Sequence, residues 1–156
     1  MGTATVRAIT LADLPELARL WHDKIVLHQQ YDRRFTLVPD ATARWSAAAE
    51  GWLADSDYAI FGAERDGHLL GYVIGRMMAA PIGLYPEQLG YVTDITVDPH
   101  SHEGGMGQLL LNALKVWFRD RDIQCIVAYV PHRGAVEQAF WRANGAVEWV
   151  DLMWIK

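Results

Sequence analysis

The sequence predicts an α/β fold in which helices cover both faces of a central, mostly antiparallel mixed sheet. The order of the patterns supports this fold, because antiparallel hairpins come first and a strand–helix–strand unit follows. The length supports it too, since 156 residues, 51% of them hydrophobic and 21% charged, are typical of one globular domain. No repeat, low-complexity tract or linker interrupts the sequence. We therefore expect a single domain over residues 1–156.

The first elements are a short strand and an amphipathic helix. Thr5–Ile9 alternates weakly and predicts the strand. Thr10 with Asp13 three residues later resembles a capping box, with Asp in place of Glu, and opens the helix. The apolar residues of this helix recur at spacings of three and four: Leu14, Leu17, Trp21 and Ile25. Tyr31–Pro39 breaks the period and ends the helix.

A second helix and a hairpin follow. Asp40 is the expected N-cap of a helix that runs to about Ala54. The strands Tyr58–Glu64 and Leu69–Met77 flank Asp66-Gly67, a dipeptide that favours a two-residue hairpin turn. These two strands therefore pair antiparallel.

The second half of the chain predicts the strand–helix–strand unit. Tyr91–Val97 is rich in β-branched residues and predicts a buried central strand. A helix follows a glycine-rich turn, with apolar residues at Met106, Leu110, Ala113, Leu114 and Trp117. Ile123–Val130 predicts the next strand, and Ala135–Ala143 predicts a helix that ends at Asn144-Gly145. The alternation in Val147–Ile155 predicts a final strand, which could pair with a second copy of the chain as a homodimer.

Composition limits the classes of partner and the compartment. The net charge of −5 disfavours a sequence-independent grip on nucleic acid and is compatible with an amine substrate. The most apolar strip, Leu69–Ile74, is far shorter than the ~20 residues that a membrane span needs. Met1–Ala8 lacks the layout of a signal peptide, and the single Cys125 fits a reducing compartment. We expect a cytoplasmic protein with neither nucleic acid nor membrane as partner, and an inert, buried Cys125.

The turn between the central strand and the next helix carries the clearest chemical signal. Gly104, Gly105 and Gly107 occupy three of four positions there. Glycines before a helix N-terminus let backbone N–H groups approach an anion closely. The alternative is a tight connection that needs glycine only for steric reasons. The phosphate loop of nucleotide hydrolases does not fit, because Gln108-Leu109 follows in place of Lys-Ser/Thr, and the dinucleotide fingerprint does not fit either, because Leu110 occupies its third glycine position.

A metal site is not expected at this turn. His100-Ser101-His102-Glu103 brings ligand types together, but no third partner follows at ligand spacing.

The turn and its surroundings resemble the acyl-CoA-binding region of the GNAT-superfamily N-acetyltransferases. Val97-Asp98-Pro99 ends the strand, Gly105 and Gly107 take the family's two glycine positions, and 140–146 (FWRANGA) parallels its later helix. The resemblance implies a GNAT-like fold that transfers acetyl from acetyl-CoA to a primary amine of a small molecule or peptide, by direct attack in a ternary complex. It implies that the residues contacting acetyl-CoA are Ile95, Val97, His102, Glu103, Gly104, Gly105, Met106, Gly107, Gln108, Gly134 and Trp141.

The sequence departs from the family at four of the matched positions. His102 replaces Arg or Gln, Gly134 replaces an Asn that meets the pantetheine arm, and Ala146 replaces Phe. Trp141 replaces the Tyr that serves as general acid. An indole N–H donates a hydrogen bond but cannot protonate a departing thiolate. We therefore assign that proton to Tyr129 or to water.

The resemblance implies that an acid on the central strand, or a water that it orients, takes the proton of the amine, and Asp94 is the one acidic residue within Tyr91–Val97. A carboxylate in an apolar strand is also costly to bury without a partner. The alternative is an Asp bonded to neighbouring backbone or lying at an exposed rim. The resemblance implies that the segment after the first helix shapes the acceptor site, with substrate contacts at His28, Tyr31, Asp32, Arg34 and Phe35. The alternative for this set is a satisfied helix-end histidine beside solvated charges.

A second function class stays open at this point. The missing Tyr and the altered Arg/Gln position are also compatible with a non-catalytic acyl-CoA-binding module that acts as a sensor or an interaction subunit. The residues leave the amine acceptor unidentified.

Overall fold

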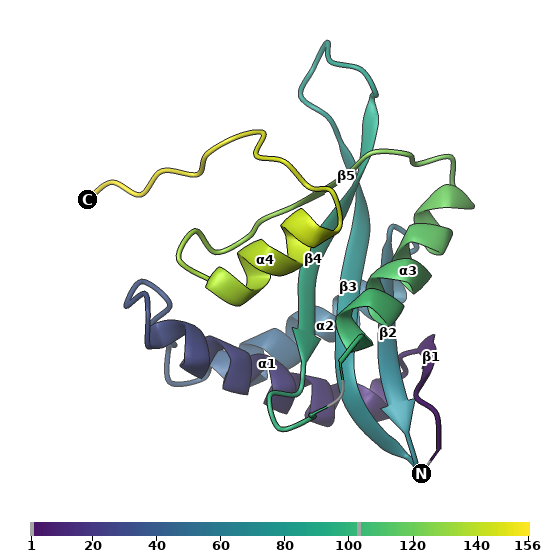
Figure 1. Ribbon diagram of the computed structural model, residues 1–156, viewed down its shortest axis with the longest axis vertical. Helices are drawn as coiled ribbons and strands as arrows, with labels where there is room; N and C mark the ends of the chain where they lie inside the picture. The colour runs from purple at the N-terminus through teal and green to yellow at the C-terminus, as the bar shows by residue number, and fades with distance from the viewer. Residues whose placement is uncertain (1, 103) are drawn as a thin grey trace.

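A computed structural model describes residues 2–102 and 104–156. In this part of the chain five strands form one sheet in the order β1-β2-β3-β4-β5 (Figure 1). The strands are β1 (Thr5–Ala8), β2 (Tyr58–Arg65), β3 (His68–Ala79), β4 (Gln88–Val97) and β5 (Ile126–Ala128). The helices are the short 3-10 helix η1 (Leu11–Asp13), then α1 (Leu14–Gln29), α2 (Ala41–Ala54), α3 (Met106–Arg119) and α4 (Ala135–Ala143). Neighbouring strands pair antiparallel except β4 and β5, which are parallel, so the predicted mixed α/β fold is confirmed.

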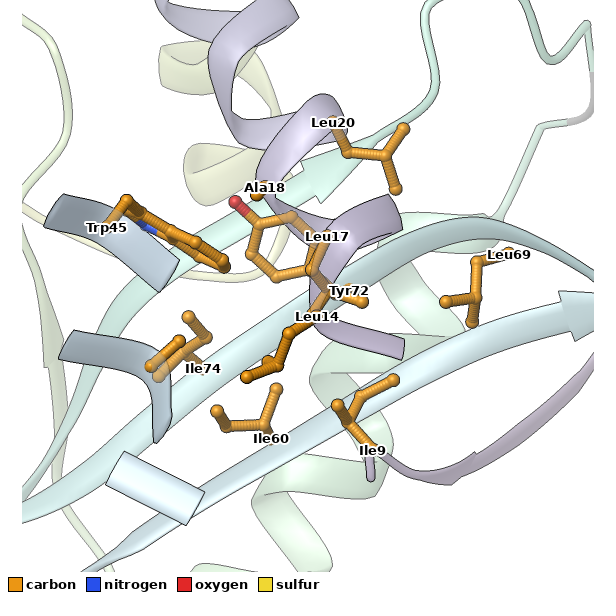
Figure 2. Packing of buried hydrophobic residues seen from close by; sticks show 11 residues of the cluster. Ile9, Leu14, Leu17, Ala18, Leu20, Trp45, Ile60, Leu69, Tyr72 and Ile74 are labelled. Carbon is orange, nitrogen blue, oxygen red and sulfur yellow. The ribbon is translucent and has the colours of Figure 1, made fainter. Parts of the chain in front are cut away.

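One face of the sheet is covered by α1 and α2. Their apolar sides pack on β2 and β3 in a cluster that includes Leu17, Trp45 and Tyr72. Figure 2 shows the Tyr72 ring rising from the sheet between α1 and Trp45, with its hydroxyl toward Ala18. The rings of Trp21 and Trp45 are stacked with their centroids 5.7 Å apart, so these tryptophans pack against each other in this cluster.

The other face is covered by α3, whose inward residues repeat at helical spacing. Met106, Leu110 and Leu114 are buried against the sheet, as predicted, whereas the predicted Ala113 and Trp117 are only partly buried. Leu111 and Phe118, which were not predicted, complete the buried side. Glycines on the strands let this helix come close: a methyl group at Gly75 would lie 2.6 Å from the Leu114 side chain. The ring of Phe140 on α4 packs on this cluster beside α3, so α4 and α3 share one layer.

A β-bulge in β4 turns its second half. Ile74 pairs with Asp94 and Gly75 pairs with Val92, so Thr93 is an extra residue on β4. Val92 faces the α3 layer, whereas Asp94, two residues later, faces the α1 layer beside Tyr72. Regular alternation would place both side chains on the same face. The bulge therefore directs the Asp94 carboxylate toward α1.

Three sequence expectations are wrong at the C-terminal half. β5 is shorter than expected, and Cys125 lies exposed just before it rather than in the core. The described residues after α4 form no strand, and the segment that includes Val147–Ile155 runs away from the sheet (Figure 1). The apolar side chains of this segment, Trp149 and Leu152 among them, are exposed, so the segment is not packed on the sheet.

No helix of the described residues combines the length and the apolar character that crossing a membrane would require.

Candidate functional site

The glycine turn opens α3 with free backbone donors. Gly105 adopts φ +88°, a left-handed conformation that favours glycine, and its carbonyl accepts from the Leu109 N–H at 3.0 Å. A methyl group at Gly104 or Gly105 would meet no atom within 4 Å, whereas one at Gly107 would lie 3.1 Å from the Phe140 ring. Steric need therefore explains Gly107 but not Gly104. The N–H groups of the first helical turn, including those of Met106 and Gln108, point out of the helix and suit an anion.

The structure describes His102 and Gln108, two further residues predicted for this turn. His102 lies exposed just before the turn, and the side-chain amide of Gln108 donates to Asn112 at 2.9 Å. Glu103 lies outside the described residues.

The strand that leads into this turn has one open edge. β4 pairs with β5 only from Gly90 to Val92, the residues that face Ile126 to Ala128. Asp98 donates its N–H to the Leu70 carbonyl at 2.7 Å, so by alternation the backbones of Thr96 and Asp94 also face β3. The N–H and C=O groups of Ile95 and Val97 consequently face the opposite edge, where β4 and β5 have parted. Both residues lie next to the turn, as the resemblance implies.

Asp94 is held by three side chains on the α1 side of this edge. Tyr72 donates its hydroxyl to Asp94 Oδ2 at 2.6 Å, and Thr96 donates to Oδ1 at 3.1 Å. The ammonium of Lys24 on α1 also donates to Oδ1. Burial, and next the negative charge of Asp94, raise the pKa of Tyr72 well above its ordinary value. The tyrosine therefore stays a hydrogen-bond donor to the carboxylate.

A second polar cluster lies one helical turn further along α1. His28 is buried, and its Nε2 lies 2.6 Å from Glu137 Oε1 on α4. This hydrogen bond, opposed by burial, lowers the pKa of Glu137, and the charge of Lys24 lowers it further. Lys24 and His28 are four residues apart on one helix face. The Asp94 and His28 clusters are therefore electrostatically connected.

The aromatic residues predicted for substrate contact gather around His28. The His28 ring lies 5.3 Å from the Tyr31 ring and 5.1 Å from the Phe35 ring. Two buried atoms of this group, His28 Nδ1 and the Tyr31 hydroxyl, have no hydrogen-bond partner among the described residues. Burial, and then the charges of Glu137 and Asp32, raise the pKa of Tyr31 to about 12. The phenol stays protonated and is free to bind a polar ligand group.

Asp32 and Arg34 stand apart from that group. Arg34 Nη2 lies 2.6 Å from Asp32 Oδ2, and this pairing, with the Arg34 backbone N–H, lowers the pKa of Asp32 to about 2. The two charges neutralise each other on the loop after α1.

α4 lies between the two polar clusters and the glycine turn, as the contacts of Gly134 and Trp141 indicate. A methyl group at Gly134 would lie 2.5 Å from Glu137 Oε2 and 3.1 Å from the Tyr31 hydroxyl. Trp141 is half-buried on the α3 layer, edge-on to Phe140 at 5.4 Å. Tyr129 follows β5 and is 65% exposed, with its ring edge-on to Tyr91 at 5.3 Å. The contact of Phe140 with Gly107 joins α4 to the turn.

Sequence reasoning missed four residues of this site: Lys24, Tyr72, Thr96 and Glu137. Tyr72 and Thr96 lie in strands whose sequence pattern predicts core residues, so neither was expected at a site. The pairing of β3 with β4 brings both side chains to Asp94. Lys24 had a weak signal, since it lies four residues before His28.

Two other features do not join this site. Among residues 2–102 and 104–156, no three His, Cys, Asp or Glu side chains gather as metal ligands would. A hollow lined by residues of the β3–β4 loop, from Ala80 to Glu87, lies at the other end of β4 from the glycine turn.

Comparison with known proteins relates this geometry to one family. Residues 23–146 match the model of the acetyltransferase (GNAT) family. The mycothiol acetyltransferase of Cellulomonas flavigena is 31% identical over 153 residues, which are 96% of this chain and 42% of that relative. The chain thus spans under half the length of this curated relative.

Solved structures share the fold at low identity. A mutant protein from Bacillus halodurans superposes with a TM-score of 0.81 at 18% identity, over 97% of this chain and 99% of that one. A predicted acetyltransferase from Clostridium acetobutylicum, solved with acetyl-CoA, has a TM-score of 0.76 at 16% identity, over 97% of this chain and 96% of that one.

Proposed function

Because the chain belongs to the GNAT acetyltransferase family, we propose that it transfers an acetyl group from acetyl-CoA to a primary amine by direct attack in a ternary complex. One observation carries the proposal. A carboxylate fixed by three side chains stands beside a strand edge with free backbone groups, and that strand leads into a glycine turn at a helix N-terminus. This arrangement unites a base, an oxyanion site and an anion site.

The glycine turn and β4 would hold acetyl-CoA. The N–H groups of Gly105 to Gln108 suit the pyrophosphate, with His102 exposed just before the turn. The outward N–H groups of Ile95 and Val97 suit the thioester oxygen and would stabilise the oxyanion that forms there. Gly134 and Trp141 on α4 would line the pantetheine arm. Support comes from the acetyl-CoA bound to the structural neighbour from Clostridium acetobutylicum.

Asp94 would accept the proton of the attacking amine, directly or through water. Tyr72 and Thr96 fix the carboxylate so that Oδ1 faces the α1 layer. Tyr129 would protonate the departing thiolate, because Trp141 has no acidic proton to give.

The acceptor would bind beside His28, Tyr31 and Phe35, with Asp32 and Arg34 at the loop edge. The carboxylates of Glu137 and Asp94 line this region, and they favour a cationic amine over an anionic one. A primary amine of a small molecule or a peptide fits this chemistry.

The setting of the protein belongs to the same proposal. A single cysteine, exposed and free, suits the reducing cytoplasm. The undocked apolar segment after α4 suits pairing with a second copy as a homodimer.

Calorimetric titration with acetyl-CoA tests the proposal, with NADH as the control ligand. We expect micromolar binding of acetyl-CoA that Gly105→Val abolishes, because a β-branched residue is strained at φ +88°. Gly51→Ala is the matched control, since Gly51 lies on α2 with open space around it. No binding by folded wild-type protein would contradict the proposal.

Turnover distinguishes an enzyme from a binding module. We expect Asp94→Asn to bind acetyl-CoA as the wild type does and to release CoA at least ~100-fold more slowly across a panel of amines, as loss of a general base predicts. Wild-type protein that binds acetyl-CoA but acetylates no amine would instead be a non-catalytic acyl-CoA-binding module.

A further inference from the structure

Lys24 presents an amine directly to the proposed base. Its side chain is 21% exposed and reaches from α1 to Asp94, where Nζ donates to Oδ1. Two further donors fix this geometry, because Tyr72 donates to Oδ2 and Thr96 donates to Oδ1, the oxygen that Lys24 also binds. Nζ therefore lies where an amine must lie to lose its proton to Asp94.

The same amine lies near the proposed thioester site. Asp94 directly precedes Ile95, and successive strand residues are about 3.3 Å apart along the chain. The β4 bulge turns Asp94 toward α1 while Ile95 keeps its backbone N–H at the open edge. An amine held at Asp94 Oδ1 is thereby close to a carbonyl group bound at Ile95.

We propose that Lys24 Nζ is itself an acetyl acceptor, so that the protein acetylates itself at this position. The inference rests on the proposed acetyl transfer. Asp94 takes a proton from the Lys24 ammonium, and the free Nζ attacks the thioester carbonyl of bound acetyl-CoA. An N–C bond forms, the attacking nitrogen gives up a second proton, and the C–S bond breaks. The two protons lost by the nitrogen pass through Asp94 to solvent, and the CoA thiolate leaves with a proton from Tyr129, which solvent then restores. The product is an uncharged amide that no longer pairs with Asp94.

The chain carries its own controls for the position of the acetyl group. The other lysines are Lys115, on α3 across the sheet, and Lys156, exposed at the C-terminal end of the chain. Chemical acetylation by acetyl-CoA without catalysis favours exposed amines. A reaction at the site favours Lys24 instead, although Lys24 is mostly buried.

Mass spectrometry of the whole protein incubated with acetyl-CoA, followed by peptide mapping, tests the proposal. We expect one acetyl group per chain, on Lys24, at a rate constant independent of protein concentration because the transfer is intramolecular. Lys24→Arg keeps the positive charge and should remove the label, whereas Lys115→Arg should keep it. Asp94→Asn should slow the labelling at least ~100-fold.

Three outcomes would overturn the inference. If the protein binds acetyl-CoA in the calorimeter but carries no acetyl group on Lys24, self-acetylation is contradicted and the proposed function is unaffected. Labelling of Lys115 or Lys156 at the rate of Lys24, or equal labelling in Asp94→Asn, shows chemical acetylation only. Protein that binds no acetyl-CoA loses both proposals together.

Discussion

The Tyr72 hydroxyl connects a core residue with the chemistry of Asp94. The ring is fully buried under α1, and the hydroxyl donates to Asp94 Oδ2 at 2.6 Å (Figure 2 shows its direction). Its raised pKa keeps the proton on the phenol, so Tyr72 orients the carboxylate without competing for the proton of the amine. Tyr72 is thus a positioning residue for the proposed base.

Removal of that hydroxyl should reduce turnover without affecting acetyl-CoA binding. A hydrogen bond to a charged group contributes about 1.5–3 kcal/mol, so we expect Tyr72→Phe to lower kcat about tenfold or more. The KM for acetyl-CoA should be unchanged, since Tyr72 lies on the α1 side of the sheet. Steady-state CoA release measures both. Tyr58→Phe on β2 is the control. An equal loss of kcat in that variant would contradict the positioning role of Tyr72, because the loss of any tyrosine hydroxyl would then slow turnover.

At the scale of the element, α1 carries both polar clusters, and the short helix η1 that leads directly into it begins with a capping box. Asp13 accepts from the Thr10 N–H at 2.8 Å and pairs with Arg7 Nη1 at 2.8 Å, so the predicted capping box is confirmed. The Arg7 hydrogen bond is the largest cause that lowers the pKa of Asp13, and the Thr10 contacts lower it further, while desolvation opposes them. The ion pair between Asp13 and Arg7 joins the start of α1 to β1.

Asp13→Ala should therefore destabilise the fold in a pH-dependent way. We expect a loss of about 1–2 kcal/mol in the free energy of unfolding at pH 7, as lost caps typically cost. The native pKa is lowered, so the stabilisation is complete above the unfolded value of about 3.9 and disappears as the pH falls through the lower native value.

Urea unfolding at several pH values measures this effect. Asp23→Ala is the control, because the contacts of Asp23 with Arg19 and His22 lie on the exposed side of the same helix. A deficit for Asp13→Ala that grows below pH 4, or one no larger than that of Asp23→Ala, would contradict the assignment.

Periodicity was enough to predict most elements, but not the way the site assembles. The α3 pattern and the hairpin at Asp66-Gly67 depend on local chemistry and were read correctly. The orientation of Asp94 was not predictable, because it depends on Thr93 being an extra residue against β3, and no residue type marks that bulge. Glu137 reaches His28 across 109 residues of sequence. Such contacts belong to the packing of α4 on α1, which local patterns do not encode.

On the scale of the whole molecule, β4 links two layers with different tasks. The Asp94 side chain of β4 faces the α1 layer, and the last residues of β4 lead to the glycine turn of the α3 layer. Acetyl-CoA and the amine would therefore reach the thioester site from opposite faces of one strand. A ternary complex needs this geometry, because neither substrate then covers the other.

The remaining open feature at this scale is the apolar segment after α4. Its exposed side chains are Trp149, Leu152, Met153, Trp154 and Ile155. Among the described residues, β5 has no strand on its outer edge, which leaves backbone groups free to pair. An exposed apolar segment and an open sheet edge on the same chain both favour association, and we expect the segment to pair with β5 of a second copy.

Light scattering of the protein eluting from a sizing column checks this expectation. We expect a dimer at micromolar concentration, and a monomer after removal of residues 149–156. This truncation keeps the exposed ion pair between Arg142 and Glu148, at 2.9 Å, and leaves the two core clusters intact. Unchanged thermal melting would show that the truncated chain still folds. A full-length monomer whose segment amides resist hydrogen exchange would contradict the dimer, because the segment would then pair with β5 of its own chain.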